Sequence, residues 1–562
     1  MIWTRLLKTL HRSTSIDPKL VVVGYDLTGH YFNELLGYKS AAAILGLPLR
    51  IIAARSVEPR LAAELLAEPT IEPIPSAWDV LPQNIVDQLI AFADSDDNLA
   101  SLWMAIAECD LRSTDMLLFP ISRPLLIVRV GEWLARRWPG RRPSVFFRFT
   151  GGEIVEKTTG QTNSAAAALF RLACSDLRKR SGQERVFLLA DTVPLARMLT
   201  RVCCRRAFPM PVPKYHVASA CVQSLPTLGI AVYVHLNKYS GRLIGELRQI
   251  LHRIAVDAPS ISFIVNSRAL SRETRGALET EMASQVEFVP EQQDTAEYFA
   301  TISRSAIVLL AYEPQAYTIG SSGVFIEATS LGKVVVAPGA TWMAEQMAAG
   351  YGVGTTFAEP KAEPVAEAVL QALGAFRRLS ALAGLLAPRI RKANSSERYI
   401  EQMIELVRQQ PDMQTNYQLG EEIDFSNAFD SHCFTGAGWG EVENWGVWTV
   451  RRRADLHFGF VSPRPTVLRA LVQPFLTKTH PRIDVRVCVG PREVAQWTFS
   501  LDGEAGGKPQ WREALIRPIE GTNTLDISFA IDAPTSPFAE GISSDQRMLG
   551  LGLRKLVFRS RD

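Results

Sequence analysis

The sequence has few cysteines and no strong excess of charge of either sign. Seven cysteines are spread over 562 residues, and their spacings suit neither a zinc site nor a disulfide scaffold. Lysine and arginine number 61 against 58 acidic residues, a formal net charge of +3, so the whole molecule is not a polycation built for nucleic acid. These scarcities predict reduced thiols in a cytoplasmic protein that has no nucleic-acid partner.

Long apolar runs are also missing. No stretch is long enough to cross a bilayer, and residues 1–12 lack the unbroken apolar segment of a signal peptide. Helical spacing instead places Trp3 and Leu6 on one face of these residues and Arg5 and Lys8 towards the other. We expect residues 1–18 to form an amphipathic segment that either docks on its own domain or makes peripheral contact with the inner face of a membrane.

The chain is too long for one hydrophobic core, and its pattern shows two similar halves. Short apolar, β-branched runs alternate with helical stretches from residue 20 to 189, and again from residue 230 to 337. Such alternation predicts βαβ units and parallel sheets. A proline-rich run at residues 208–213 interrupts it, because proline suits neither a helix interior nor a central strand. We expect an α/β protein with two Rossmann-like domains facing a cleft, at residues 19–225 and 226–410.

The last part of the chain has a different periodicity. After a polar linker at residues 411–420, apolar and polar residues alternate strictly, as at Ile483, Val485 and Val487. Period-two alternation between glycine- and proline-containing turns is typical of antiparallel strands with one solvated face. Residues 421–562 are therefore expected to form a β-sandwich.

The segment at residues 311–336 is the most informative for function. It follows a strand, passes through the loop Gly320, Ser321, Ser322 and Gly323, and enters a helix that carries Glu327. A loop of small residues at a helix N-terminus offers N–H groups and hydroxyls to a phosphate, and the glutamate could accept hydrogen bonds from two ribose hydroxyls. The alternative is an N-cap serine followed by a solvated helix glutamate.

This segment resembles the donor half of retaining GT-B glycosyltransferases of the group 1 type. The shared pattern is a tyrosine-bearing loop, a small-residue turn, a Glu-Ala helix, then Gly-Lys and an apolar strand. The resemblance implies that Glu327 holds the ribose of a nucleotide sugar and that Ser321, Ser322 and Gly323 contact its diphosphate. Many members carry an earlier glutamate that meets the donor sugar, and Ile319 stands at that place here.

Two further loops resemble parts of the same family. The loop at residues 234–242 corresponds to the place where cations meet the leaving diphosphate, so Lys238 and Arg242 are candidates for stabilising the charge that develops there. In the first half, Gly29 and His30 follow the first strand, where acceptor and donor would approach, and His30 is a candidate acid or base. The alternatives are solvated surface charges at Lys238 and Arg242 and a structural hydrogen bond at His30.

Metal chemistry is not expected. The only Asp-x-Asp, Asp94 with Asp96, follows a helical stretch and not the strand end where metal-dependent transferases carry theirs. We therefore predict no metal and no cofactor, with the nucleotide sugar as a substrate. Polar residues also fall at other predicted strand ends, without an assigned chemical step: Arg148, Thr150, Asp191 and Thr192.

The C-terminal segment contains several tryptophans. The run at residues 438–448 and the Leu-Gly-Leu-Gly-Leu run at residues 549–553 resemble a β-sandwich module attached to bacterial polysaccharide-synthesis enzymes. Trp439, Trp445 and Trp448 could stack on the apolar faces of sugar rings. The alternative is that they fill the sandwich core, which we expect for at least one of them.

Together these patterns predict a metal-independent glycosyltransferase of bacterial surface-polysaccharide synthesis. It would move a sugar from a nucleoside diphosphate to a glycan or lipid-linked acceptor. A nucleotide-sugar epimerase on the same fold and a non-catalytic glycan-binding scaffold with a decayed donor site remain as alternatives. Replacing Glu327 by Gln should lower donor affinity and leave the stability of the unliganded protein almost unchanged.

Overall fold

The computed structural model describes most of the chain in two compact units. Described are residues 18–24, 30–72, 96–137, 142–156, 160–179, 185–214, 230–237, 240–266, 270–290, 295–410, 416–460, 462, 464–503, 505–518 and 524–561. The first unit holds both α/β domains, and the second comprises residues 411–562 together with residues 170–175 and 197–206. The N-terminal amphipathic segment lies outside the described residues.

The first α/β domain is built on a seven-stranded parallel sheet with the order β3-β2-β1-β4-β5-β8-β9. Strand β1 (Leu20–Gly24) begins where the sequence predicts the first apolar run, and every one of its residues is buried. Its other strands are β2 (Leu49–Ala54), β3 (Ala67–Ile71), β4 (Met116–Phe119), β5 (Ser144–Phe149), β8 (Val186–Ala190) and β9 (Ala207–Pro209). The short strand β9 lies at the edge of the sheet and has no second neighbouring strand. Pro209, which has no N–H to donate, is therefore tolerated there.

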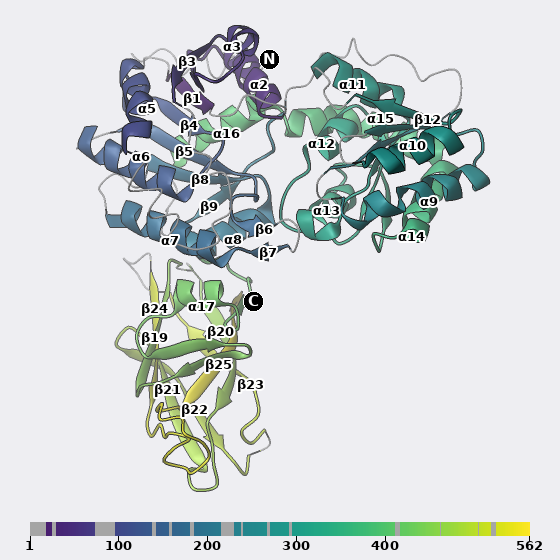
Figure 1. Ribbon diagram of the computed structural model, residues 1–562. Helices are drawn as coiled ribbons and strands as arrows, with labels where there is room; N and C mark the ends of the chain where they lie inside the picture. Colours follow the sequence, from purple (N-terminus) through teal and green to yellow (C-terminus); the bar gives the residue numbers. More distant parts are fainter. Residues whose placement is uncertain are drawn as a thin grey trace. The chain divides into compact units, whose positions relative to one another are not determined.

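Helices connect the strands of this sheet and flank it (Figure 1). They are α2 (His30–Leu45), α3 (Pro59–Leu65), α5 (Asp96–Glu108), α6 (Pro124–Arg137), α7 (Ser164–Lys179) and α8 (Val193–Cys203). A small hairpin of β6 (Val155–Glu156) and β7 (Gln161–Thr162) precedes α7. Because the order of strands reverses between β1 and β4, the sheet has the topology of a Rossmann-like domain.

The second α/β domain repeats this plan with six parallel strands in the order β12-β11-β10-β13-β14-β15. The strands are β10 (Ala231–His235), β11 (Ser262–Asn266), β12 (Val286–Val289), β13 (Ile307–Leu310), β14 (Val334–Pro338) and β15 (Gly354–Phe357). Its helices are α9 (Arg242–Asp257), α10 (Arg272–Glu281), α11 (Thr295–Arg304), α12 (Gly323–Ser330), α13 (Trp342–Ala348), α14 (Ala362–Gly374) and α15 (Phe376–Ala393). The strand order again reverses between β10 and β13, so the prediction of two Rossmann-like domains is confirmed.

Helix α16 (Ser396–Gln409) follows the second domain along the chain. It packs along α2 of the first domain, where the rings of Tyr38 and Tyr399 lie 5.8 Å apart. The two segments that join the domains therefore run side by side: the N–H of Lys214 donates to the carbonyl of Asn394 at 3.0 Å, and Lys214 pairs with Ser395 in an isolated parallel bridge.

The C-terminal residues form two packed antiparallel sheets, which confirms the predicted sandwich. One sheet has the order β17-β18-β25-β20-β23, with β16 also paired to β25, and the other has the order β19-β24-β21-β22. The strands are β16 (Ile423–Asp424), β17 (Trp439–Glu443), β18 (Gly446–Thr449), β19 (Arg453–Phe458), β20 (Thr466–Pro474), β21 (Arg482–Val489), β22 (Arg492–Ser500), β23 (Gln510–Ile516), β24 (Leu525–Ile531) and β25 (Leu551–Ser560). A single helix among the described residues of this part, α17 (Ala428–Phe434), precedes β17.

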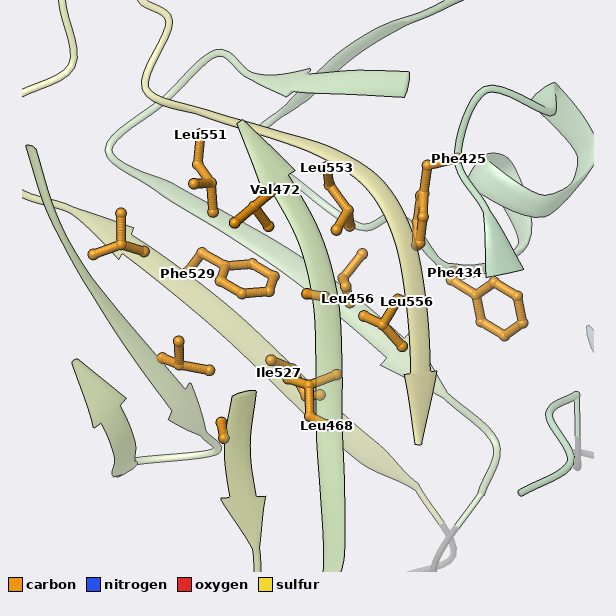
Figure 2. Close-up of a cluster of buried hydrophobic side chains, with 14 of the residues drawn as sticks. Phe425, Phe434, Leu456, Leu468, Val472, Ile527, Phe529, Leu551, Leu553 and Leu556 are labelled. Atoms are coloured by element: carbon orange, nitrogen blue, oxygen red, sulfur yellow. The ribbon is translucent and has the colours of Figure 1, made fainter. Parts of the chain in front are cut away.

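The sandwich core is made by the inward residues of the alternating strands. Figure 2 shows Leu456, Leu468, Ile527 and Phe529 of facing strands converging on one another, and all are at most 1% exposed. Buried apolar area of this kind is the main favourable contribution to folding. The regular alternation of buried and less buried residues along β20 and β21 explains why the sequence pattern predicted these strands.

Among the described helices, no single one is both long and apolar enough to cross a bilayer. Helices α14 and α15 meet the length and composition requirement only as a pair, and they are bent by 81° at the break between them.

Candidate functional site

The segment singled out from the sequence forms the carboxyl edge of the second sheet. After β13 the chain makes a short 3₁₀ turn, η5 (Pro314–Tyr317), and then enters α12 at Gly323. Ser322 is the N-cap of α12, and its hydroxyl accepts a hydrogen bond from the N–H of Phe325 at 3.3 Å. Gly332, which follows the helix, has a φ of +71° that favours glycine. The predicted helix and its capping serine are therefore present.

Glu327 is not a solvated helix residue. Its side chain is 1% exposed, and its Oε1 lies 3.1 Å from the ammonium of Lys214. Its Oε2 accepts a hydrogen bond of 2.7 Å from the hydroxyl of Tyr298, on α11. Burial, together with the Glu327 carboxylate, raises the pKa of Tyr298 well above its ordinary value, so the tyrosine is a hydrogen-bond donor at neutral pH.

The ammonium of Lys214 lies at the N-terminus of α12. A Cβ atom added at Gly323 would be 2.6 Å from Lys214 Nζ, so only glycine leaves this space for the ammonium. Burial lowers the pKa of Lys214, but the carboxylates of Glu327 and Glu34 together outweigh that effect, and the pKa is raised above its ordinary value. A cation beside the free N–H groups of a helix N-terminus is a suitable environment for an anion such as a diphosphate.

This buried pair changes one expectation from the sequence. Removing one partner of a buried ion pair leaves an uncompensated charge and costs about 3–5 kcal/mol. We therefore replace the expectation that Glu327→Gln leaves stability almost unchanged by an expected loss of this size. Helical spacing alone does not reveal that Lys214 and Tyr298 reach Glu327.

The Ser321 turn is tied to the strand ends of the first domain. The Ser321 hydroxyl donates to Asp191 Oδ2 at 3.1 Å, and the Thr192 hydroxyl donates to the carbonyl of Ile319 at 2.5 Å. Backbones meet closely beside these bonds, since a Cβ at Gly151 would lie 3.6 Å from the Cα of Gly320. The turn that the sequence assigned to diphosphate contact is thus held by side chains that follow β8.

Asp191 belongs to a buried charge network at the carboxyl edge of the first sheet. Arg148, at 1% exposure, donates to Asp191 from Nε at 2.7 Å and to Glu34 from Nη1 at 2.5 Å. Two carboxylates therefore share one guanidinium. Complete burial raises the pKa of Asp191 above its ordinary value, and Arg148 offsets this only in part. The hydrogen bond from Ser321 satisfies part of the remaining acceptor capacity.

The other predicted site residues are placed less favourably or lie outside the described residues. Lys238 and Gly29 are among the residues not described. His30 is the first residue of α2, and its side chain is not described. Arg242 begins α9, and its side chain is exposed. Its N–H donates to Glu313 Oε1 at 2.9 Å, so a carboxylate of the chain itself occupies the N-terminus of α9.

A polar cluster that the sequence analysis missed lies where the order of the second sheet reverses. His235 ends β10, and its Nδ1 is 2.8 Å from the hydroxyl of Tyr312, which follows β13. The rings of Tyr312 and Tyr317 stack at 4.7 Å, and the amide of Asn237 donates to the hydroxyl of Tyr317 at 3.0 Å. Ligands of open α/β sheets bind at this kind of position. The feature of the sequence that could have indicated this cluster is His235, a histidine at the end of a predicted strand.

The three tryptophans of the sandwich divide into two groups. Trp439 packs against the core, with its ring 5.9 Å from Phe529 and its indole N–H donating to the carbonyl of Asp455 at 2.7 Å. Trp445 and Trp448 lie on the other face, over Gly552, where an added Cβ would be 2.4 Å from Trp445. Their rings are 4.8 Å apart and both are partly exposed. The expectation that at least one tryptophan fills the core agrees with the position of Trp439.

Within the described ranges, no three His, Cys, Asp or Glu side chains are grouped so that they could hold a metal ion. None of the six described cysteines is paired in a disulfide: Cys109, Cys174, Cys203, Cys204, Cys433 and Cys488.

The two sheets, the return of α16 to the first domain and the charged groups at the sheet edges define the class. The chain is an α/β protein of two Rossmann-like domains, extended by an antiparallel β-sandwich. No protein-family model matches the chain, and no curated protein matches it.

Solved structures resemble about 70% of the chain at low sequence identity. A glycosyltransferase from Rickettsia africae ESF-5 is 12% identical, with a TM-score of 0.45, over 70% of this chain and 98% of that chain. A trehalose-6-phosphate synthase is 14% identical, with a TM-score of 0.47, over 70% and 99%. A UDP-GlcNAc 2-epimerase from Neisseria meningitidis, bound to UDP-GlcNAc, is 14% identical, with a TM-score of 0.40, over 70% and 100%. At these values the similarities do not identify a reaction for this chain.

Proposed function

We propose that this protein transfers a sugar from a nucleoside diphosphate to a glycan or lipid-linked acceptor. The observation that carries the proposal is the Lys214–Glu327 pair at the N-terminus of α12. It brings together a cation, free helix N–H groups and a carboxylate at the carboxyl edge of the second sheet. These are the groups that a diphosphate and a ribose require.

In the proposed reaction the protein supplies orientation and charge stabilisation. As the bond between sugar and diphosphate breaks, negative charge develops on the leaving oxygen, and Lys214 with the N-terminus of α12 would stabilise it. Glu327 would accept hydrogen bonds from the ribose and fix the donor relative to the acceptor. No metal enters this scheme. Lys238 and Arg242 keep their proposed role at the leaving diphosphate. Gly29 keeps its place where donor and acceptor approach, and His30 keeps its role as an acid or base.

The sandwich fits the same proposal as a contact for the acceptor glycan. Trp445 and Trp448 present partly exposed rings on a sheet face, where the apolar side of a sugar could stack. Trp439 is not part of this contact, since its ring packs on the core. We propose that the protein works in the cytoplasm on bacterial surface polysaccharide, at or near the inner face of the membrane.

One observation favours a second candidate, a scaffold that binds glycans without catalysis. Glu327 is already bonded to Lys214 and Tyr298, and Ile319 stands where related enzymes carry a sugar-contacting glutamate. A donor must therefore share Glu327 with groups of the protein itself. Product analysis with and without acceptor separates the candidates, because an epimerase converts the donor alone, a transferase needs acceptor and a scaffold does neither.

Donor binding is the first experiment. A panel of UDP-, GDP-, ADP- and dTDP-sugars is screened by thermal shift, since a ligand of the native state raises its stability by mass action. Affinity for the best donor is then measured by calorimetry in a variant with both Lys214→Met and Glu327→Gln, which carries no unpaired charge. We expect a loss of about a hundredfold, equivalent to ~2.8 kcal/mol.

The matched control is Glu287→Gln, which removes an exposed carboxylate of the same domain, paired with Arg304 on the surface. It should bind the donor like the unmodified protein. The proposal is wrong if no nucleotide sugar of the panel binds, or if the double variant binds the donor with unchanged affinity.

A further inference from the structure

The middle turns of helix α15, residues 381–387, expose leucine and bury alanine. Leu385 is 75% exposed and Leu382 is 44% exposed, whereas Ala383 and Ala387 are buried at 3% and 4%. A helix that only covers the core of its own domain is expected to turn its larger apolar side chains inwards. The opposite arrangement here indicates that the outer side of α15 has a partner.

The two leucines share one stripe of the helix with three cations. Residues three and four positions apart lie on the same side of a helix, and this spacing is followed by Arg378, Leu382, Leu385, Arg389 and Lys392. All five side chains are exposed. This stripe, the α15 face, has leucines at its centre and cations towards both ends. It extends over about 21 Å, at a rise of ~1.5 Å per residue.

Helix α15 contains no acidic residue. Its basic residues are Arg377, Arg378, Arg389, Arg391 and Lys392. Among the described residues none of these five forms an ion pair, and Arg389 stacks on the ring of Tyr351 at 4.8 Å. The acidic Glu363 of the neighbouring α14 is paired with Arg253 of α9. The α15 face therefore keeps an excess of positive charge that an anionic surface would neutralise.

The combination of exposed leucines and unpaired cations selects between the possible partners. A second copy of this chain is disfavoured, because a symmetric contact over the same face would bring the cations of two α15 helices together. A glycan is disfavoured because the face has no aromatic residue on which a sugar ring could stack. A membrane with anionic lipids suits both properties, since apolar side chains enter the interfacial region and cations meet the headgroups.

We propose that the α15 face docks the protein on an anionic lipid membrane. Leu382 and Leu385 insert at the level of the headgroups, and the long basic side chains extend to the phosphates. The other side of α15 packs on α12, the helix of the proposed donor site. Lipid binding does not depend on the proposed transfer reaction, although docking through α15 would bring that helix close to a lipid-linked acceptor.

The test is flotation of the full-length protein with vesicles of phosphatidylcholine and phosphatidylglycerol, compared with vesicles of phosphatidylcholine alone. We expect binding to the anionic vesicles only, and a loss of binding at high salt, because salt screens exposed charges. A variant with both Arg378→Gln and Leu385→Ala should bind about thirtyfold more weakly. One basic residue near an anionic surface contributes about a fivefold factor, and the partly inserted leucine contributes a factor of similar size.

The matched control combines Arg272→Gln with Val256→Ala. Arg272 is an exposed cation of α10, and Val256 of α9 is 75% exposed, as Leu385 is. Neither residue belongs to the α15 face, so the control should float like the unmodified protein. Both variants should unfold at nearly the same temperature as that protein, because the changed side chains are exposed.

The result is separable from the donor experiment, because the α15 variant should keep its affinity for a nucleotide sugar. If that variant fails to fold, Lys392→Gln decides the question, with an expected loss of about fivefold.

The proposal is overturned if the protein binds neither kind of vesicle or binds both equally. It is also overturned if the α15 variant floats as well as the control, which would assign lipid binding to another part of the chain, such as residues 1–18. Sedimentation of the same proteins tests the remaining occupant. A dimer that dissociates in the α15 variant would assign the face to a second copy and would equally overturn the proposal.

Discussion

Lys214 and Glu327 form an ion pair of 3.1 Å in which the side chains are only 3% and 1% exposed. The lysine lies on the connection between the two α/β domains, and the glutamate lies on the helix of the proposed donor site. Because charges this deeply buried must be compensated, the pair fixes the connection and the helix relative to each other.

A double-mutant cycle measures this coupling. Glu327→Gln and Lys214→Met should each lower the free energy of unfolding by about 3–5 kcal/mol, because each leaves one buried charge unpaired. The double variant should be more stable than the sum of the single effects implies, with a coupling energy of about 1–3 kcal/mol. Urea unfolding followed by circular dichroism gives all four values. Additive single effects would show that the two side chains do not interact in solution.

Gly323→Ala tests the space beside the Lys214 ammonium. The added methyl would lie 2.6 Å from Nζ, so the lysine must move away from Glu327 and α12. Overpacking of this kind costs about 1–3 kcal/mol, and donor affinity should fall with it.

The matched control is Gly276→Ala in α10, where an added Cβ meets nothing within 4 Å. That change should stabilise the protein by about 0.5–1 kcal/mol, because alanine is the better helix former. Thermal unfolding of both variants checks the pair. If Gly323→Ala is as harmless as the control, the ammonium does not occupy this position.

The sandwich should fold as an isolated fragment that begins at Asn416, because Tyr417 is 2% exposed in the core and its hydroxyl accepts from the N–H of Phe558 at 2.9 Å. Asp430 is a weak point of such a fragment. In the second unit Asp430 is 6% exposed and forms an ion pair with Arg201, which also contacts Glu421 at 2.9 Å. A fragment of residues 416–562 lacks Arg201, so Asp430 loses the cation that compensates its charge. Asp430→Asn should therefore stabilise the fragment and destabilise the full chain. Thermal unfolding of the fragment and of the full chain, each with and without Asp430→Asn, measures the two effects. A change of stability in the same direction in the fragment and in the full chain would contradict the role of Arg201.

Glu540 gives the sandwich a defined acid sensitivity. Hydrogen bonds from the hydroxyls of Thr477, Thr479 and Thr535 lower the pKa of Glu540 to about 2. Because the pKa is lower in the folded protein than the ordinary value of 4.5, its contribution to stability is full above that value and is lost as the pH falls towards about 2. Glu540→Gln should flatten this part of the stability profile, which urea unfolding at a series of pH values measures. An identical slope in both proteins would contradict the assignment.

The parts of the fold that the sequence predicted are those fixed by local pattern. Strand β1 begins at residue 20, as predicted, because a short β-branched run suits a buried parallel strand. Helix α15 was not predicted, and it carries Gly384 and Pro388, which weaken a helical pattern. Its packing against α12 and β14 stabilises the helix, although its local helix propensity is weak.

The candidate site could be predicted only in part, because several of its contacts join residues that are far apart in the sequence. The capping role of Ser322 is local and was visible in the sequence. The partners of Glu327 and Ser321 come from Lys214, Tyr298 and Asp191, which are brought to them by the tertiary fold alone. No spacing along the chain encodes such contacts.

The return of α16 to α2 has a consequence for the order in which the protein can be completed during synthesis. Domains generally fold from the N-terminus as the chain emerges, but the first domain lacks one of its helices until residues 396–409 have been made. The ribosome must finish the whole second domain before it supplies that helix. Until then the face of α2 that carries Tyr38 has no cover from Tyr399, so a nascent chain stalled between the domains should depend on chaperones more than its apolar content suggests.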